Sequence, residues 1–261
     1  MRFSVISSGS KANCTFVEGG GARILIDCGL SAKQAALRLG ELGIEADSID
    51  AICVTHEHSD HIKGVPVFSR RHQVPVYANC GAAPYLDGVY ELCVFETGNP
   101  FSLAGMQILP FSIVHDAAEP VGFVVEADGQ RFGQATDIGK VTTLVRQALR
   151  GCHALVLEAN HDPQLLRDCA YPWELKQRIA SAAGHLSNDQ AAELLAELNS
   201  YGLTQVVLGH ISENSNTPET ALAAVQRRLD LSLFQSFYCA SAVCACELIE
   251  LAPAPCAVVS L

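Results

Sequence analysis

The sequence lacks any apolar run of the roughly 18–20 residues that a membrane-spanning helix needs. Its first residues, MRFSVISSGSKANC, also lack the long apolar segment and cleavage site of a secretory signal peptide. We therefore expect no membrane contact and a cytoplasmic location. No low-complexity tract or evident linker interrupts the chain, so residues 1–261 are expected to form a single domain.

Paired cysteines and positive charge are also scarce. The eleven cysteines include no CxxC pair, which favours buried, reduced thiols over a zinc ribbon or a disulfide framework. Seventeen Lys and Arg residues against 28 Asp and Glu residues give a net charge of −11. This balance argues against broad nonspecific binding to nucleic acid. It does not exclude a nuclease, because bound divalent cations supply local positive charge.

Segments rich in β-branched residues alternate with helical patterns along the chain. Capping boxes at Ser31 with Gln34 and at Ser187 with Gln190 predict two helix starts, and Pro218 suits the first turn of a third helix. Further helices are expected over residues 65–72 and 140–149. The predicted strands are 3–6, 15–18, 23–27, 49–54, 74–78, 106–114, 122–127, 131–135, 154–157, 206–208 and the apolar stretch 234–251.

Short turns between these strands decide the fold class. Asp128-Gly129 is a typical hairpin turn, and a run of glycines joins the strands at 15–18 and 23–27. Such hairpins imply antiparallel pairing, which a single doubly wound parallel sheet would not show. The predicted fold is therefore a layered α/β arrangement with two sheets inside and helices outside.

The stretch THEHSDHIKG, residues 55–64, follows a predicted buried strand. It places His56, His58, Asp60 and His61 within six positions. A polar turn that is rich in histidine by chance is one interpretation. A metal site is the stronger one, because imidazole and carboxylate suit Zn²⁺, Mn²⁺ or Fe, and four ligands can serve two ions.

Other potential ligands follow other predicted strands. His115 ends the strand at 106–114, Asp137 follows the strand at 131–135, and His210 follows the strand at 206–208. Asp27, at the end of a further strand, is expected to hold a ligand histidine in place from behind. The sequence therefore predicts one metal centre assembled from several strand ends.

The motif HEHSDH, with Asp27 upstream and His115, Asp137 and His210 downstream, resembles the metallo-β-lactamase superfamily over almost the whole chain. It is most similar to the YycJ/WalJ-like subgroup. The supporting segments are residues 8–13, 56–64, 160–162, 171–173, 184–188, 209–212 and 214–218. The resemblance implies an αββα sandwich with two divalent metal ions at its edge. It also implies 5′-to-3′ exonuclease activity on DNA.

The resemblance also assigns ligands in this sequence. His56, His58 and His115 would hold one ion, Asp60, His61 and His210 the other, and Asp137 would bridge the two. A hydroxide shared by the ions is then expected to attack a phosphodiester, with Asp60 among the catalytic residues. His185, near a helix start at Ser187, is the candidate proton donor for the leaving group. A histidine that only caps this helix is the alternative.

Substrate contacts are expected from two polar segments near the predicted site. The turn at 8–13 has backbone N–H groups that could meet a phosphate, although a plain hairpin loop is the alternative. His161 either contacts substrate or caps the following helix. The residues predicted to bind substrate are Ser8, Ser10, Lys11, Asn13, Asn160 and His161.

Spacing separates the possible substrates. About 70 residues lie between Asp137 and His210, which leaves no room for the inserted domain of RNA-processing β-CASP relatives. The short interval from His115 to Asp137 similarly leaves no room for a tRNA-gripping arm. A carboxylate at position 137, where lactamases often have a ligand cysteine, favours phosphodiester or thioester hydrolysis.

Three functions stay open on the sequence alone. A DNA exonuclease or another phosphodiesterase, including one for small cyclic phosphodiesters, ranks first. A thioester hydrolase like glyoxalase II ranks lower, because only about 50 residues follow His210 and part of them looks like strand rather than a helical domain. A metal-dependent binding protein without turnover ranks last. The oligomeric state, monomer or homodimer, is also open.

Overall fold

Alternating apolar side chains along the strands face two different hydrophobic layers. On β3 (Ala22–Ile26), Ile24 and Ile26 point into a core between the two sheets. Leu25, between them, points the other way into a core beneath helices. Successive side chains of a strand face opposite sides, so an uninterrupted apolar strand requires packing on both faces. This requirement produces a layered fold.

The computed structural model describes residues 1–251, which form two seven-stranded mixed sheets. The first sheet has the order β14-β1-β2-β3-β4-β5-β6. Its strands are β1 (Arg2–Ser7), β2 (Cys14–Gly19), β3, β4 (Ala51–Cys53), β5 (Val76–Ala78), β6 (Leu92–Val94) and β14 (Ile249–Glu250). The second sheet has the order β13-β12-β11-β10-β9-β8-β7. Its strands are β7 (Phe101–Leu103), β8 (Met106–Ser112), β9 (Val121–Ala127), β10 (Gln130–Ala135), β11 (Ala154–Glu158), β12 (Gln205–Gly209) and β13 (Ser236–Cys239).

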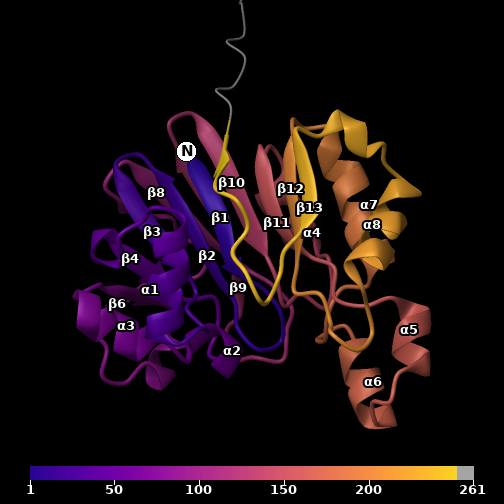
Figure 1. Ribbon diagram of the computed structural model, residues 1–261, viewed down its shortest axis with the longest axis horizontal. Coiled ribbons are helices and arrows are strands. Elements are labelled where there is room, and N and C mark those ends of the chain that lie inside the picture. Colours follow the sequence, from indigo (N-terminus) through magenta and orange to yellow (C-terminus); the bar gives the residue numbers. More distant parts are fainter. Residues whose placement is uncertain (252–261) are drawn as a thin grey trace, which may run out of the picture.

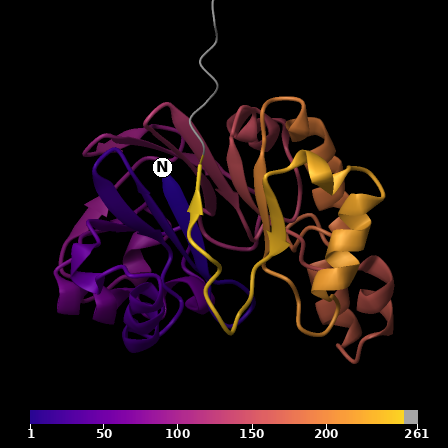
Figure 2. The same ribbon diagram turned by 45° about the horizontal axis from the view of Figure 1, so that its top comes forward.

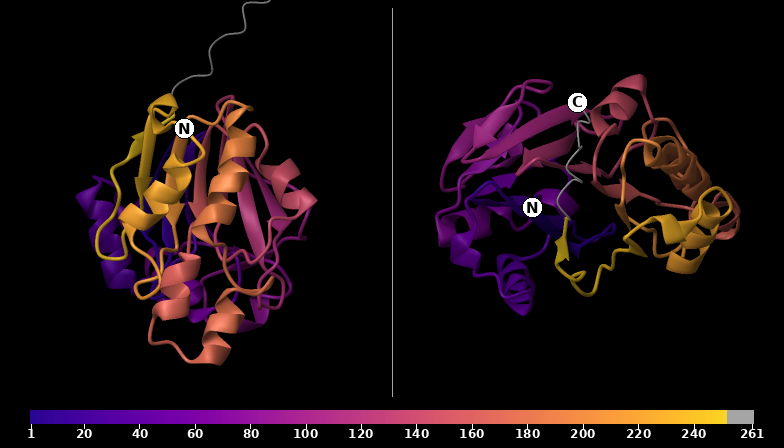
Figure 3. Two further views of the ribbon diagram at one scale, coloured as in Figure 1. Left: turned by 90° about the vertical axis from the view of Figure 1, so that its right-hand side faces the viewer. Right: turned by 90° about the horizontal axis from the view of Figure 1, so that it is seen from above.

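Helices cover the outer face of each sheet (Figure 1). Helices α1 (Ala32–Glu41) and α3 (Val65–His72) pack on the first sheet, and α4 (Thr143–Leu149), α7 (Asn188–Asn199) and α8 (Pro218–Gln226) pack on the second. The turned views in Figure 2 and Figure 3 show the two sheets face to face between these helices. Helices α5 (Pro163–Asp168) and α6 (Trp173–Ile179) lie near each other at the lower right of Figure 1, and α2 (Ser59–Ile62) lies at the bottom of the other half. Short 3₁₀ turns occupy Ala46–Ser48, Ala83–Tyr85 and Leu231–Leu233.

The structure confirms the predicted four-layer αββα sandwich. The capping box at Ser187 is complete, whereas at Ser31 only the bond from the Gln34 N–H to the serine hydroxyl is seen. The Asp128-Gly129 turn joins β9 to β10 with both residues left-handed, as such hairpins require. None of the helices between residues 1 and 251 has the length and apolar character needed to cross a bilayer.

Two sequence predictions need correction. Residues 234–251 are not one strand: β13 pairs with β12 in the second sheet and β14 pairs with β1 in the first, so the chain between them crosses from sheet to sheet. The cysteines are free, but not uniformly buried. Among the ten that the structure describes, Cys80 and Cys244 are exposed, and the eleventh, Cys256, lies outside the described residues.

Candidate metal centre

The loop that follows β4 is held tightly against the turn after β3. The Cys28 N–H donates to the His61 carbonyl and the Gly64 N–H donates to the Cys28 carbonyl, each at 2.8 Å. Glycine is required where these backbones meet, because a Cβ on Gly64 would lie 1.8 Å from the Leu30 carbonyl oxygen. This close approach fixes the position of the short helix α2 and its histidines.

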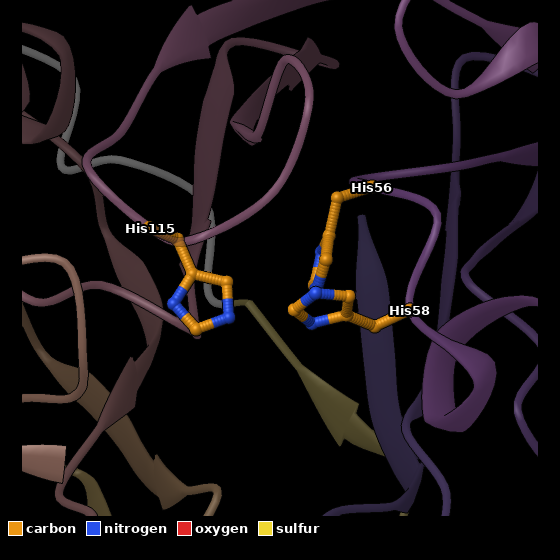
Figure 4. Close-up of side chains that lie close together, drawn as sticks. All are labelled: His56, His58 and His115. Atoms are coloured by element: carbon orange, nitrogen blue, oxygen red, sulfur yellow. The ribbon is translucent and has the colours of Figure 1, made fainter. Parts of the chain in front are cut away.

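Three histidines form the first cluster, which Figure 4 shows. His56 and His58 come from the loop after β4, and His115 reaches them from the other half of the molecule, just after β8. One ring nitrogen from each lies within 4.8 Å of the others. His115 Nδ1 lies 3.1 Å from the Gly184 carbonyl, so this nitrogen carries a proton and Nε2 is the one available as a ligand.

Two aspartates and two histidines form the second cluster: Asp60, His61, Asp137 and His210. His61 Nε2 lies 3.1 Å from Asp137 Oδ2 and 3.4 Å from Asp60 Oδ2. His210 Nε2 lies 3.4 Å from Asp137 Oδ1. Asp137 also lies 3.8 Å from His115 Nε2, so it stands between the two clusters.

Parallel strands explain why these residues meet. Strands β10, β11 and β12 are mutually parallel, as are β3 and β4, so their carboxyl ends share one edge of each sheet. Asp27, Asp137 and His210 follow β3, β10 and β12, and all three adopt left-handed backbone conformations. Such conformations are uncommon outside glycine and persist at sites where the surrounding structure imposes them.

Two buried carboxylates hold the ligand histidines from behind. Asp27 Oδ2 lies 2.8 Å from His61 Nδ1, and both Asp27 oxygens accept bonds from Thr55. This is the supporting position that the sequence predicted for Asp27. Glu158, the last residue of β11, does the same for His210, with Oε1 2.9 Å from Nδ1. Sequence reasoning missed Glu158, although it too stands at a strand end.

Glu158 also positions His185. Its Oε1 lies 2.8 Å from His185 Nδ1, and its Oε2 accepts bonds from the backbone N–H groups of Ile138 and Leu186. Because Nδ1 is engaged in this way, Nε2 is the nitrogen through which His185 can exchange a proton with a substrate. His185 lines the site cavity, so the structure places this predicted residue beside the clusters.

Charged neighbours shift the pKa values of the site residues in the direction opposite to burial. Burial lowers the pKa of His210, but the neighbouring carboxylates of Asp137, Asp60 and Glu158 outweigh burial and raise this pKa to about 10. Burial raises the pKa of Glu158, yet the facing His185 and His210 bring it down to about 2. Burial also raises the pKa of Asp60, but the neighbouring His210 and His61 rings outweigh burial and lower it.

Polar atoms at the centre of the site fit a metal ion. Within the described residues, His56 Nε2 and His210 Nε2 are buried and have no hydrogen-bond partner. Buried polar atoms without partners are costly, and inward-facing imidazole nitrogens and carboxylate oxygens are the donors that zinc and manganese accept. The donor set therefore fits divalent metal ions.

The residues predicted to bind substrate separate into two groups. Three support the ligands: the Ser8 hydroxyl accepts from the His210 N–H at 2.7 Å, Asn13 donates to Asp60 at 3.0 Å, and Asn160 donates to the His210 carbonyl at 2.8 Å. Ser8 and Asn13 therefore face inward, which corrects the expectation that they face a substrate. Asn160 also lines the cavity.

The other three predicted substrate contacts lie further out. Ser10 lines the site cavity. Lys11 is exposed and bonded to Glu213 at 2.8 Å, away from the clusters. His161 lines a neighbouring cavity instead of the site cavity, and it does not cap the following helix, because Asp162 does.

The site cavity has a volume of about 270 Å³. Its walls also contain residues that sequence reasoning missed, and they come mainly from α6 and the loop before it. These are Tyr171, Leu175, Arg178, Ile179 and Ser212. Helix α6 was not predicted, because its seven residues are too few for a clear helical period.

Comparison with known proteins identifies relatives along most of the chain. Residues 22–211 match the β-lactamase superfamily domain. The chain is 34% identical over 236 residues to the exodeoxyribonuclease YycJ of Bacillus anthracis, covering 88% of this chain and 89% of the relative. It is 35% identical to the exodeoxyribonuclease WalJ of Streptococcus pneumoniae, covering 84% and 85%.

Solved structures agree on the fold. The metallo-β-lactamase fold protein YhfI from Bacillus subtilis superposes with a TM-score of 0.71 at 15% identity, over 94% of this chain and 99% of YhfI. A diphosphatase of the PhnP family superposes with a TM-score of 0.67 at 21% identity, over 96% and 98%. At these identities, the likeness shows the shared fold alone.

Proposed function

The chain belongs to the metallo-β-lactamase superfamily, and on that basis we propose that it is a metal-dependent phosphodiesterase that degrades DNA as a 5′-to-3′ exonuclease. The observation that carries the proposal is the pair of ligand clusters that meet at Asp137 in one cavity. The similarity to exodeoxyribonucleases over most of the chain supports DNA as the substrate.

Each cluster would hold one divalent ion, zinc or manganese, or alternatively iron. His56, His58 and His115 would bind the first, and Asp60, His61 and His210 the second, with Asp137 between them. When bound, such a pair of ions activates water as a nucleophile and neutralises charge on a phosphoryl group. These His and Asp side chains would hold both ions in position. Asp60 would contribute to catalysis as one of the metal ligands.

His185 would give a proton to the oxygen of the leaving group. Glu158 fixes its ring through Nδ1 and, with hydrogen bonding, raises its pKa against the opposing effect of burial. A raised pKa favours the protonated ring, which is the form that a general acid requires. Nε2 would then be the donating atom.

The remaining properties follow from this proposal. The expected location stays the cytoplasm, and the whole chain would act as one domain, because the proposed ligands come from both halves of the sandwich. Either a monomer or a homodimer is compatible with a site built within one chain.

The test is hydrolysis of 5′-labelled single-stranded and duplex DNA with Mn²⁺ or Zn²⁺, beside a cyclic phosphodiester and a glutathione thioester. Asp60→Ala and His115→Ala are expected to abolish DNA cleavage and lower metal content. Asp87→Ala, at an exposed aspartate outside the site cavity, is the matched control and should behave as wild type. Turnover of the thioester alone, or full activity in both site variants, would overturn the proposal.

His185→Ala separates proton donation from metal binding. Because His185 is assigned to neither ion, the rate should fall by a factor of about 10²–10⁴ while both ions stay bound. Metal content is measured by atomic emission on the same preparation. An unchanged rate would make His185 a structural residue.

A further inference from the structure

We infer that helix α6 and the loop before it form the binding site for the DNA strand beside the scissile bond. In this assignment Arg178 binds a backbone phosphate and Trp173 stacks against a base. The inference rests on the proposed function, since it names the part of the chain that would recognise the substrate.

Helix α6 separates two cavities. Leu175 and Arg178 of α6, three residues apart on one helix face, line the site cavity together with Tyr171 of the preceding loop. Trp173, Lys176, Gln177 and Ala180, at the same spacing, line a second cavity of about 430 Å³ on the other side. In Figure 1 and Figure 3 the two short helices α5 and α6 stand below the second sheet, at the edge where the metal ligands gather. A DNA strand that leaves the site cavity and passes over α6 therefore reaches the second cavity.

Arg178 is the one Lys or Arg side chain among the described residues that line the site cavity. Its Nε donates to Asp116 Oδ2 at 2.6 Å, and both side chains are partly exposed. An exposed ion pair contributes little stability, so it breaks at low cost. A backbone phosphate offers the guanidinium two oxygens in the same paired geometry and the same single negative charge, so we expect it to take the place of Asp116 in this exposed pair.

Asp116 links this exchange to the metal cluster. Its other oxygen lies 3.2 Å from His115 Nε2, the nitrogen assigned to the first ion. The Asp116 carboxylate therefore lies between the Arg178 guanidinium and the proposed metal ligand His115. Arg178 is placed to take the phosphate next to the one that reacts, and not the reacting group itself.

Trp173 is the only tryptophan of the chain, and 65% of its surface is exposed. A large aromatic ring at the rim of a cavity is a platform on which a base can stack. The cavity wall also carries Arg167 and Lys176, whose charges suit the backbone of the same strand. His161 lines this cavity as well.

The local charge distinguishes a nucleic acid from other occupants. The protein as a whole is acidic, with a net charge of −11, so a strand needs a place where cations gather. The two cavities on either side of α6 supply Arg178 on one face and Arg167 with Lys176 on the other. A purely apolar partner would gain nothing from these cations.

Equilibrium binding tests the two contacts separately. The probe is a fluorescent single-stranded oligonucleotide with phosphorothioate linkages, which slow cleavage, added to the metal-loaded protein over a range of salt. Arg178→Ala should lower the slope of log K against log[salt] by about 0.7, the value for one lost phosphate contact on a single strand. Arg178→Lys, which keeps the charge, should restore most of that slope.

Trp173→Ala should weaken binding roughly 5–150-fold at every salt concentration and leave the slope unchanged, because stacking involves no counterion release. Trp173→Phe should recover most of the affinity. In wild type, an oligonucleotide series with one abasic position should show the same loss at a single position, and the Trp173→Ala variant should be insensitive to it.

Matched controls lie just after helices α7 and α8. Arg227→Ala breaks an exposed pair with Asp189, like that of Arg178, and Tyr201→Ala removes an exposed ring that contacts Arg150. Both are expected to bind DNA as wild type. Thermal unfolding of each variant checks the fold.

The outcomes also separate this inference from the proposed function. Wild type that cleaves DNA while the Arg178 and Trp173 variants bind and cleave equally well would overturn the inference alone. Wild type that neither binds nor cleaves DNA would overturn both. If Trp173→Ala changes the oligomeric state and not DNA affinity, the second cavity is a contact between subunits and the inference is wrong.

Discussion

Glu158 is the residue on which the two proposed roles of the site converge. Its two carboxylate oxygens bond His185, His210 and two backbone N–H groups, so one side chain orients both a proposed ligand and the proposed proton donor. Groups that bond the far nitrogen of a ligand histidine fix its tautomer and make it a better donor.

Glu158→Gln keeps the shape of this side chain and removes its charge. We expect metal affinity and activity to fall about 10–100-fold, since losses of this size follow the removal of such supporting groups. Titration with zinc or manganese measures the affinity. Glu126→Gln, at an exposed glutamate of β9, is the matched control. A wild-type affinity in the Glu158 variant would contradict this role.

The raised pKa of His210 gives metal binding its own pH dependence. With a pKa of about 10 in the metal-free protein, His210 is protonated at neutral pH and must lose its proton to bind an ion. The apparent affinity should therefore keep rising with pH from about 7 towards 10. An ordinary histidine with a pKa near 6.5 would level off above neutral pH.

Calorimetric titrations in buffers of different ionisation enthalpy check this directly. At pH 7.5 the protein should release protons as it takes up metal. The number of protons released per metal ion should fall as the pH approaches 10. An affinity that levels off just above pH 7, with no proton release, would show that His210 is neutral before metal arrives.

At the scale of single residues, the sequence drew attention to the proposed ligands more than to the residues that support them. His56, His58, Asp60 and His61 are dense in sequence, and the remaining candidates each follow an apolar strand. Glu158 also stands at the end of an apolar strand, but as the last residue of that strand it was not predicted to belong to the site. The Arg178–Asp116 pair joins positions 62 apart, a contact that no local pattern reveals.

Among the structural elements, the turn after β3 and the helix α2 depend on glycine at their contact. A Cβ on Gly29 would lie 1.7 Å from the Asp60 carbonyl oxygen, and one on Gly64 would lie 1.8 Å from that of Leu30. The obstacle in both cases is backbone, which cannot swing aside as a flexible side chain can. Side chains at either position would push the loop of ligands away from β3.

Gly64→Ala is therefore expected to destabilise the protein by about 3 kcal/mol, at the upper end for overpacking, and to lower metal affinity. Gly40→Ala is the matched control, because Gly40 is exposed in helix α1 with nothing within 4 Å of an added Cβ. That change should stabilise the protein by about 0.5–1 kcal/mol. Denaturant unfolding measures both, and equal effects would contradict the steric argument.

Element prediction succeeded where apolar alternation and capping residues agree, as in β3 and α7. It failed for residues 234–251, because an apolar stretch predicts burial but not which sheet each part joins. Pairing of β14 with β1 spans nearly the whole chain, and such long-range partners leave no local signal. Helix α6 was not predicted because it is short and largely exposed, so its sequence has no clear apolar pattern.

On the scale of the whole molecule, the candidate metal centre joins the two halves of the sandwich. His56, His58, Asp60 and His61 follow β4 of the first sheet, whereas the other ligands follow strands of the second. The halves otherwise meet through the apolar core between the sheets. Bound ions would therefore add cross-links at an edge where buried charges and unpaired polar atoms concentrate.

Removing metal should consequently lower the thermal stability of the entire protein in one transition. One ion at about 1,000 times its dissociation constant stabilises the folded state by about 4 kcal/mol. For a chain of this size that corresponds to a rise in Tm of roughly 8–16 °C. Scanning calorimetry with chelator and with added Mn²⁺ or Zn²⁺ measures the shift. His58→Ala should lose much of it and Asp87→Ala should keep it, and a Tm insensitive to metal would contradict a centre that joins the two halves.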